Sequence, residues 1–246
     1  MSRRVAISQS NYIPWKGWFD LLGTVDEFML YDEVQYTRRD WRNRNKIKTP
    51  AGLKWLTIPV QAKGKYHQRI DETLITGTEW AENHLTTMRH MYASTSHFAT
   101  YLPALERIYG APPERLSDVN RALIELVVAE LGFSTTITWS TDYDVPEARR
   151  ARSEDGDATE LLAALSEAAG AQTYVSGPAA KAYMQHDRFD RRGIAVEYFD
   201  YGPYPAYEQP HPPFEHGVSV LDLLFCTGPD ARGHLHAAAK PGTRVG

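Results

Sequence analysis

The chain has 246 residues and a formal net charge of -4, with 42% hydrophobic and 11% aromatic residues. This composition is typical of a soluble globular protein with an apolar core, and it excludes a disordered chain. The charge also argues against binding of a long nucleic acid over the whole surface. The single cysteine, Cys226, excludes an internal disulfide and a cysteine-cluster zinc site. The sequence shows no signal-like segment and no apolar run of about 18 residues, so we expect a cytoplasmic protein that does not span a membrane.

The start of the chain predicts a βαβ unit. Residues 3–8 contain the consecutive apolar side chains of a buried strand, residues 18–23 have helical spacing, and a second apolar run at residues 28–31 predicts a strand at 27–34. A strand, a short helix and a strand in this order predict a parallel sheet. Ligands bind beyond the carboxyl ends of such strands. Because Gln9 and Asp32 both follow a strand, we expect them at one site.

The remaining elements continue this α/β pattern. We expect further strands at residues 53–60, 70–76, 135–139, 173–175 and 194–199, and helices at 78–93, 98–109, 112–131, 158–169, 179–184 and 218–225. The polar residues 140–157 predict a flexible loop or lid, and residues 201–214 predict an irregular aromatic loop. Together they predict a single α/β domain over residues 1–246, with a small parallel sheet, a helical insertion at about 78–131 and a loose tail at 228–246.

Amides and aromatic residues are concentrated directly after the first strand. Gln9, Asn11, Tyr12, Trp15 and Trp18 lie within ten positions. Amides offer donors and acceptors to a sugar or nucleotide, and indoles offer stacking faces. This segment therefore predicts a binding site for a polar ligand. The alternative is a tight turn capped by its own amides, with the tryptophans in the core.

A basic segment follows at residues 38–48. Guanidinium groups pair with phosphate or carboxylate, so the segment predicts a clamp for a small anionic ligand, such as the diphosphate of a nucleotide-sugar or the phosphate of a carrier or tRNA end. The alternative is a solvated charged loop. The segment contains Arg38, Arg39, Arg42, Arg44, Lys46 and Lys48, with Trp41, Asn43 and Asn45 between them.

A second anion site is predicted at the turn Ser176-Gly177-Pro178 before a helix. Backbone N–H groups at a helix start favour an anion, and Lys181 lies one turn further on. A plain turn is the alternative.

Three groups are candidates for acid–base or nucleophilic catalysis: Asp32, His84 and Cys226. Asp32 has the best location. His84 lies on an otherwise apolar helix face, where a core histidine is an equal alternative. Cys226 follows an apolar run, which is typical of a buried, inert thiol. His211 and His216 in the late aromatic loop are further candidates to approach the site. The scattered histidines predict no metal site, and we expect no cofactor.

Several segments resemble a known family. They are AISQSNYIPWKGWFDLL, YDEVQYTRRDWRNRNKIKTP and KWLTIPV in the first third, then Trp80 to His84, YVSGPAAKAY and SVLDLLF. In these the chain resembles the WbqC-like family of bacterial proteins. It departs from the family at Ser10, where the family usually has proline. The resemblance implies a role in surface-polysaccharide or O-antigen biosynthesis, with glycyl transfer to an amino sugar as a suggested activity.

A weaker likeness is to nucleotidyltransferases of the HIGH type, which also place a P-x-x-G turn between strand and helix. It implies a HUP/nucleotidyltransferase-like arrangement of the sheet. In that pattern Trp15 and Trp18 occupy the places of the two histidines that stabilise the transferred phosphate. Without these donors, adenylyl transfer by that mechanism is not expected.

From these observations we expect a transferase that moves an aminoacyl group, glycyl first, to the amine of a nucleotide-linked amino sugar or related metabolite. One alternative is a non-catalytic nucleotide-sugar-binding or scaffold protein of a glycan or natural-product pathway. Another is an ATP-using ligase or nucleotidyltransferase. The donor stays open between a free amino acid with ATP, an aminoacyl-tRNA and an aminoacyl carrier protein. The predicted base is Asp32 or His84, and the predicted binding residues are Gln9, Asn11, Tyr12, Trp15, Gln35, Arg42, Asn43, Arg44, Lys46, Ser176 and Lys181.

Overall fold

The computed structural model describes residues 2–156 and 158–239. Their contacts divide them into two compact units, and each unit is described by itself. The first unit contains residues 2–9, 21–31 and 134–202, and the second contains residues 10–20, 32–133 and 203–239. The prediction of one domain with a helical insertion stays a prediction. None of the helices in the described part of the chain has the length and apolar character needed to cross a membrane.

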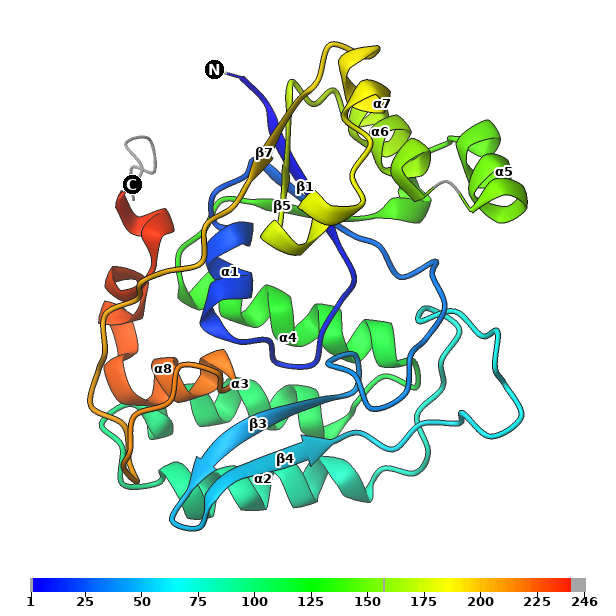
Figure 1. The fold of residues 1–246 in the computed structure, drawn as a ribbon. Coiled ribbons are helices and arrows are strands. Elements are labelled where there is room, and N and C mark those ends of the chain that lie inside the picture. The colour runs from blue at the N-terminus through cyan, green and yellow to red at the C-terminus, as the bar shows by residue number, and fades with distance from the viewer. Residues whose placement is uncertain (1, 157, 240–246) are drawn as a thin grey trace. The chain divides into compact units, whose positions relative to one another are not determined.

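The first unit is built on a five-stranded sheet in the order β5-β2-β1-β6-β7 (Figure 1). The strands are β1 (Arg4–Ser8), β2 (Glu27–Leu30), β5 (Thr136–Trp139), β6 (Thr173–Ser176) and β7 (Ala195–Tyr198). Each neighbouring pair is parallel. The prediction of an α/β fold with a small parallel sheet is therefore confirmed. The apolar run Val5-Ala6-Ile7 is buried, as expected for a central strand covered on both faces.

The strand order reverses between β1 and β6. The chain places β2 and β5 on one side of β1, and then β6 and β7 on the other. In open parallel sheets the carboxyl edge at such a reversal is the usual ligand site. Gln9 directly follows β1 and Ser176 ends β6, so two predicted site residues belong to this edge.

The helices of the first unit include a segment that was expected to be a flexible loop. The prediction of a flexible loop or lid at residues 140–157 is wrong for most of the segment, which forms a 3-10 helix η1 (Ser140–Asp142) and a helix α5 (Pro146–Asp155). Proline at the first helical position and Gly156, with φ of 71° after the last turn, define the ends of α5. Residue 157 lies outside the described residues. The unit also contains α6 (Ala158–Ala168), η2 (Pro178–Ala182) and α7 (His186–Asp190).

The second unit contains a two-stranded antiparallel sheet that the sequence did not predict. It consists of β3 (Arg44–Thr49) and β4 (Gly52–Thr57). The basic segment therefore supplies a strand, and the strand expected at residues 53–60 pairs with it in a separate hairpin. The strand expected at residues 70–76 is also wrong, since Leu74 and Ile75 form only isolated bridges.

The second unit also contains several helices (Figure 1). The three helices predicted between residues 78 and 131 are confirmed as α2 (Glu79–Tyr92), α3 (Phe98–Gly110) and α4 (Leu116–Glu130). Helix α3 packs against α2, α4 and α8 (Val220–Thr227). Helix α1 (Lys16–Leu22) begins in this unit, and its last two residues belong to the first.

The expected C-terminal tail is structured where it is described. Residues 228–239 form the 3-10 helices η3 (Gly228–His234) and η4 (His236–Ala239), and Ala231, Leu235 and Ala237 are buried. Residues 240–246 lie outside the described residues.

Candidate functional site

The turn that leads into α1 is held in a strained conformation. Ile13 has a φ of 37°, which is costly for a β-branched residue. Asn45 holds the turn in place, because its side-chain Nδ2 donates to the carbonyls of Tyr12 and Ile13 at 3.1 and 2.9 Å. The backbone N–H of Tyr12 also donates to the carbonyl of Trp41 at 3.0 Å. The basic segment therefore fixes the conformation of the polar segment before α1.

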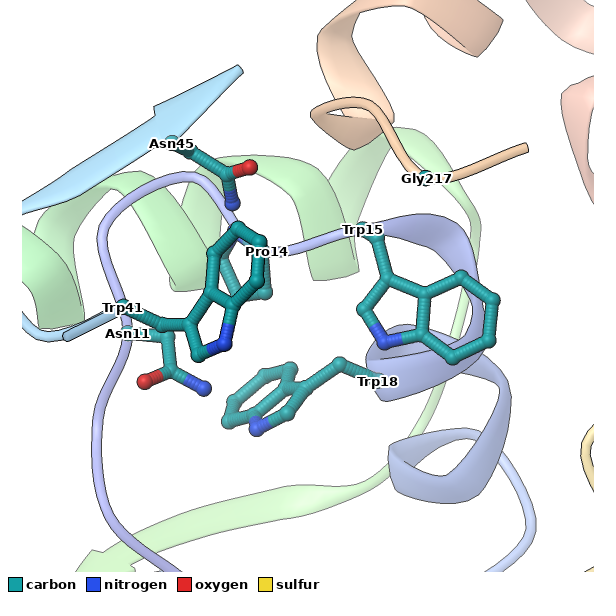
Figure 2. Close-up of a pocket in the computed structure, with 7 residues that line it drawn as sticks. All are labelled: Asn11, Pro14, Trp15, Trp18, Trp41, Asn45 and Gly217. Atoms are coloured by element: carbon teal, nitrogen blue, oxygen red, sulfur yellow. The ribbon is translucent and has the colours of Figure 1, made fainter. Parts of the chain in front are cut away.

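A cavity of about 350 Å³ lies beside this turn. Figure 2 shows three indoles around one space, with the amide of Asn11 beside two of them. The lining residues that the structure describes carry no titratable side chain, so the cavity is an aromatic and amide site. They are Asn11, Pro14, Trp15, Trp18, Trp41, Asn45 and Gly217.

The position of Trp15 in the cavity wall requires a glycine. A Cβ atom on Gly17 would lie 2.3 Å from Cζ2 of the Trp15 indole, which is far inside van der Waals contact. Glycine in the first turn of α1 therefore allows the indole to lie directly on the helix backbone. The edge of Trp15 also meets the ring of Tyr204, with centroids 5.9 Å apart.

Asn11 presents a defined donor to the cavity. Its Oδ1 accepts a hydrogen bond from Nη1 of Arg42. Since a guanidinium can only donate, this contact fixes which end of the amide is the oxygen. The Nδ2 of Asn11 is therefore left to donate to a ligand. Arg42 is mostly buried, with 14% of its side chain exposed, and burial lowers its pKa.

Asp32 is buried one hydrogen bond away from this segment. Its Oδ1 accepts from the backbone N–H of Ser10 at 2.7 Å, and its Oδ2 has no partner within the described part of the chain. Burial raises the pKa of Asp32 to about 6, although the hydrogen bonds from Ser10 and the charge of Arg42 lower it. The side chain of Asn120 ties the same segment together by donating to Ser10 Oγ and to the carbonyl of Arg42.

His84 and Tyr12 lie together in a closed cluster rather than in the cavity lining. The hydroxyl of Tyr12 is hydrogen-bonded to Nδ1 of His84 at 2.8 Å and to the hydroxyl of Tyr109. The imidazole also hydrogen-bonds to the backbone of Thr57, and Trp80 packs against it. Burial lowers the pKa of His84 to about 4, so the ring is neutral at physiological pH. We call Tyr12, His84, Tyr109 and Trp80 the tyrosine–histidine cluster.

The cations and amides of the basic segment have different surroundings. Asn43 is buried and donates to the carbonyl of Ile58 at 2.7 Å. Lys48 is buried and donates to the carbonyl of Pro213. By contrast, the charged groups of Arg44 and Lys46 lie over the ring of Trp55, at 4.1 and 5.1 Å from its centroid.

The other predicted residues are distributed over both units. Gln9, Ser176 and Lys181 belong to the first unit, where Lys181 lies over the ring of Tyr198 at 5.2 Å. Gln35 belongs to the second unit, where it is exposed and donates to the carbonyl of Tyr66. Whether these residues bind the ligand stays a prediction.

Several residues that contribute to the site are not among the predicted site residues. Trp18, Trp41 and Asn45 lie in the polar and basic segments near the start of the chain, and their residue types could have identified them. Ser10 and Pro14 belong to the same segment as Asn11 and Trp15. Gly217 and Asn120 carry no functional signal in the sequence, and they reach the site through contacts with distant parts of the chain.

Cys226 does not line the cavity, and Tyr204 of the late loop contacts the lining residue Trp15 from outside the lining. Burial raises the pKa of the Cys226 thiol well above its usual value. His211 and His216 are not among the lining residues. Among residues 2–156 and 158–239, no three His, Cys, Asp or Glu side chains are grouped so as to hold a metal ion.

Comparisons with known proteins agree with the sequence resemblance. The model of the WbqC-like protein family matches residues 9–234. The chain is 47% identical over 234 residues to the uncharacterized protein Rv1507c of Mycobacterium tuberculosis (strain ATCC 25618 / H37Rv), an alignment that covers 95% of this chain and 97% of that protein. No solved structure matches the chain.

Proposed function

The chain belongs to the WbqC-like protein family, and from this premise we propose that it transfers an aminoacyl group, glycyl first, to the amine of a nucleotide-linked amino sugar or a related metabolite. The observation that carries the proposal is the cavity beside α1. Indole faces pack well against the apolar faces of a sugar ring, and the oriented Nδ2 of Asn11 can donate to a ring hydroxyl. The proposal includes a cytoplasmic location and no binding of long nucleic acids.

The reaction needs a proton acceptor and a group that stabilises negative charge. The amine nitrogen attacks the carbonyl carbon of the activated aminoacyl donor, so that the C–N bond forms and the bond to the donor oxygen or sulfur breaks. The ammonium must first lose a proton, and the tetrahedral intermediate carries an oxyanion. We assign electrostatic stabilisation of the oxyanion to Arg42, whose guanidinium holds Asn11 at the cavity wall without lining the cavity itself.

Asp32 is the better candidate for the base. Its Oδ2 has no partner within the described residues, and its raised pKa of about 6 makes it a stronger base than an ordinary aspartate. The imidazole of His84 is already engaged, because its Nδ1 is hydrogen-bonded to Tyr12 and the ring also hydrogen-bonds to the backbone of Thr57. Asp32 is not in the cavity lining, so the proposal requires a water molecule to carry the proton from the amine to the Oδ2 of Asp32.

A second candidate is a non-catalytic protein that binds the same ligand. The observation that favours it is the cavity lining, which carries no titratable side chain among the described residues. No specific contact favours the third possibility, an ATP-using ligase or nucleotidyltransferase, since Trp15 and Trp18 form cavity wall where that mechanism needs histidines.

A transfer assay separates the candidates. The purified protein is mixed with a UDP- or dTDP-linked hexosamine that has a free amine, and with glycyl-tRNA, a glycyl carrier-protein thioester, or glycine and ATP. Mass spectrometry detects the glycylated sugar, and calorimetry measures binding. We expect transfer, and we expect Asp32→Asn to lower the rate about 100-fold or more while binding persists. The wild-type rate should rise with pH through about 6 as Asp32 ionises.

The other outcomes are equally informative. Binding without transfer from any donor supports the non-catalytic candidate. Absence of binding contradicts both. Pyrophosphate or ADP release on mixing with ATP supports the ligase or nucleotidyltransferase.

A further inference from the structure

Two tryptophans stand exposed beside the cavity. Trp41 keeps 42% of its surface exposed and Trp55 keeps 38%, which is unusual for indoles in a protein with a well-formed core. Their ring centroids are 5.3 Å apart and their planes are inclined by 41°. Trp55 lies on β4, and Trp41 lies in the turn before β3, where its carbonyl accepts a hydrogen bond from the backbone N–H of Tyr12. Exposed, rigidly held indoles are surfaces on which a flat ring can stack.

Two cations accompany these rings. The guanidinium of Arg44 lies 4.1 Å from the centroid of Trp55, and Nζ of Lys46 lies 5.1 Å from Trp55 and 5.7 Å from Trp41. Lys46 is the direct partner of Trp55 across the hairpin, so both side chains emerge on one face. Within the described part of the chain, no carboxylate lies within ion-pair distance of Arg44 or Lys46, although Arg44 donates to the carbonyl of Arg39 and its charge helps to lower the pKa of Asp40. We call Trp41, Trp55, Arg44 and Lys46 the tryptophan platform.

The tryptophan platform is continuous with the cavity. Trp41 belongs to both, and Lys46 directly follows Asn45, whose side chain lines the cavity. No cation lines the cavity itself among the described residues, so the phosphates of an anionic ligand are not neutralised inside it. The cavity volume of about 350 Å³ is near the lower end for small-molecule sites, which favours occupation by only one part of a larger ligand.

We propose that the tryptophan platform binds the nucleoside diphosphate half of the ligand whose sugar occupies the cavity. The nucleobase stacks on Trp55 and Trp41, and the two phosphates contact Lys46 and Arg44. This inference rests on the proposed function, because it divides one nucleotide-linked sugar between two subsites. The nucleotide is then recognised by the tryptophan platform and the sugar by the cavity.

Single-stranded RNA has the same recognition chemistry, since aromatic rings and cations also bind its bases and phosphates. The net charge of -4 and the small number of cations on the tryptophan platform favour the small nucleotide. RNA binding is therefore an outcome of the test rather than part of the proposal.

The test measures binding of UDP and dTDP alone, without any sugar, by calorimetry. The variants are Trp55→Ala and Lys46→Gln. Matched controls are Leu53→Ala, an exposed residue of the same strand, and Lys54→Gln, an exposed lysine next to Trp55 in sequence. We expect binding to the wild type, a roughly tenfold or greater loss in Trp55→Ala from the lost stacking, and a weaker salt dependence in Lys46→Gln. The two controls should bind like the wild type.

Three results would overturn the inference. They are no binding of either nucleotide to the wild type, wild-type affinity in both Trp55→Ala and Lys46→Gln, and binding of a single-stranded RNA oligonucleotide that depends on Trp55 while UDP and dTDP do not bind. The transfer assay keeps this failure distinct from failure of the proposed function. Transfer with an unchanged KM for the nucleotide-linked sugar in both variants rejects only the inference. Nucleotide binding on the platform without transfer rejects only the transferase.

Discussion

The cavity and the tyrosine–histidine cluster are made of similar residues, but they differ in whether their polar groups can still bind a ligand. Asn11 and Tyr12 are neighbours in the chain, yet Asn11 lines the cavity and Tyr12 is completely buried. In the cluster, the hydroxyl of Tyr12 bonds to both His84 and Tyr109. In the cavity, the Nδ2 of Asn11 remains available after Arg42 has fixed the amide.

The difference shows how one segment can serve both stability and recognition. The strained backbone at Ile13 lies directly after these two residues, and Asn45 holds it from the neighbouring strand. The buried side chain of Tyr12 stabilises the turn, and the turn places Asn11, Pro14 and Trp15 in the cavity wall. Polar and aromatic residues of one type can therefore be assigned to structure or to binding only by their partners.

The largest effect should follow from removal of Tyr12. Tyr12→Ala should lower the free energy of unfolding by about 3–5 kcal/mol, because it leaves a cavity in the core. Tyr12→Phe should lower it by about 1–3 kcal/mol, because His84 and Tyr109 lose a buried hydrogen bond. Urea denaturation measures both. The folded fraction of Tyr12→Phe should bind ligand like the wild type, and a large selective loss of affinity would place Tyr12 in the binding site.

The next-largest effect should be a loss of folding stability at low pH, caused by His84 of the tyrosine–histidine cluster. His84 has a pKa of about 4 when folded and about 6.5 when unfolded. Between these values the unfolded chain binds a proton that the folded chain does not, so stability should fall as the pH drops from about 6.5 to about 4. The loss should be on the order of 3 kcal/mol. His84→Gln should lack this component, and an unchanged pH profile in that variant would contradict the burial of a neutral imidazole.

A smaller effect should come from the cavity wall. Gly17→Ala should displace the Trp15 indole, since the new Cβ would lie 2.3 Å from it. We expect about a tenfold loss of affinity for the nucleotide-linked sugar from the lost aromatic contact. Gly110→Ala is the matched control, because that position has open space and lies at the end of α3. Equal affinities in both variants would show that Trp15 does not contact the ligand.

The smallest effect should come from Asn11. Asn11→Ala should weaken sugar binding about three- to tenfold through loss of one hydrogen bond. Asn45→Ala provides the contrast, because its amide holds the backbone of Tyr12 and Ile13 and should mainly affect stability. Thermal unfolding and calorimetry on the two variants separate these roles. A loss of stability in Asn11→Ala and a selective loss of sugar affinity in Asn45→Ala would contradict the assignment.

The parallel sheet could be predicted because its strands follow simple rules. Consecutive apolar residues mark β1 and β2, and the short helix between them requires a parallel crossover. Strand β3 could not be found in this way. Its sequence, Arg-Asn-Lys-Ile-Lys-Thr, has one apolar residue, and it is stabilised by pairing with β4 and by the hydrogen bonds that the buried side chains of Asn45 and Lys48 donate.

The types of residue in the candidate site could be predicted from the sequence, but the side chains that each of them contacts could not. Asn11 and Trp15 were placed in the site from their position after β1, and both line the cavity. Tyr12 was given the same role, but its partners His84 and Tyr109 lie 72 and 97 residues away. Helix α5 was missed because its charged sequence has no apolar face, and its ends are set by Pro146 and Gly156.

The most direct test of the central claim is a crystal structure of the protein grown with a saturating UDP- or dTDP-linked hexosamine. We predict that the sugar ring lies in the cavity, between the indoles of Trp15, Trp18 and Trp41, with a ring hydroxyl or the amine within hydrogen-bond distance of Asn11 Nδ2. A sugar ordered elsewhere on the protein, with this cavity filled only by solvent, would contradict it.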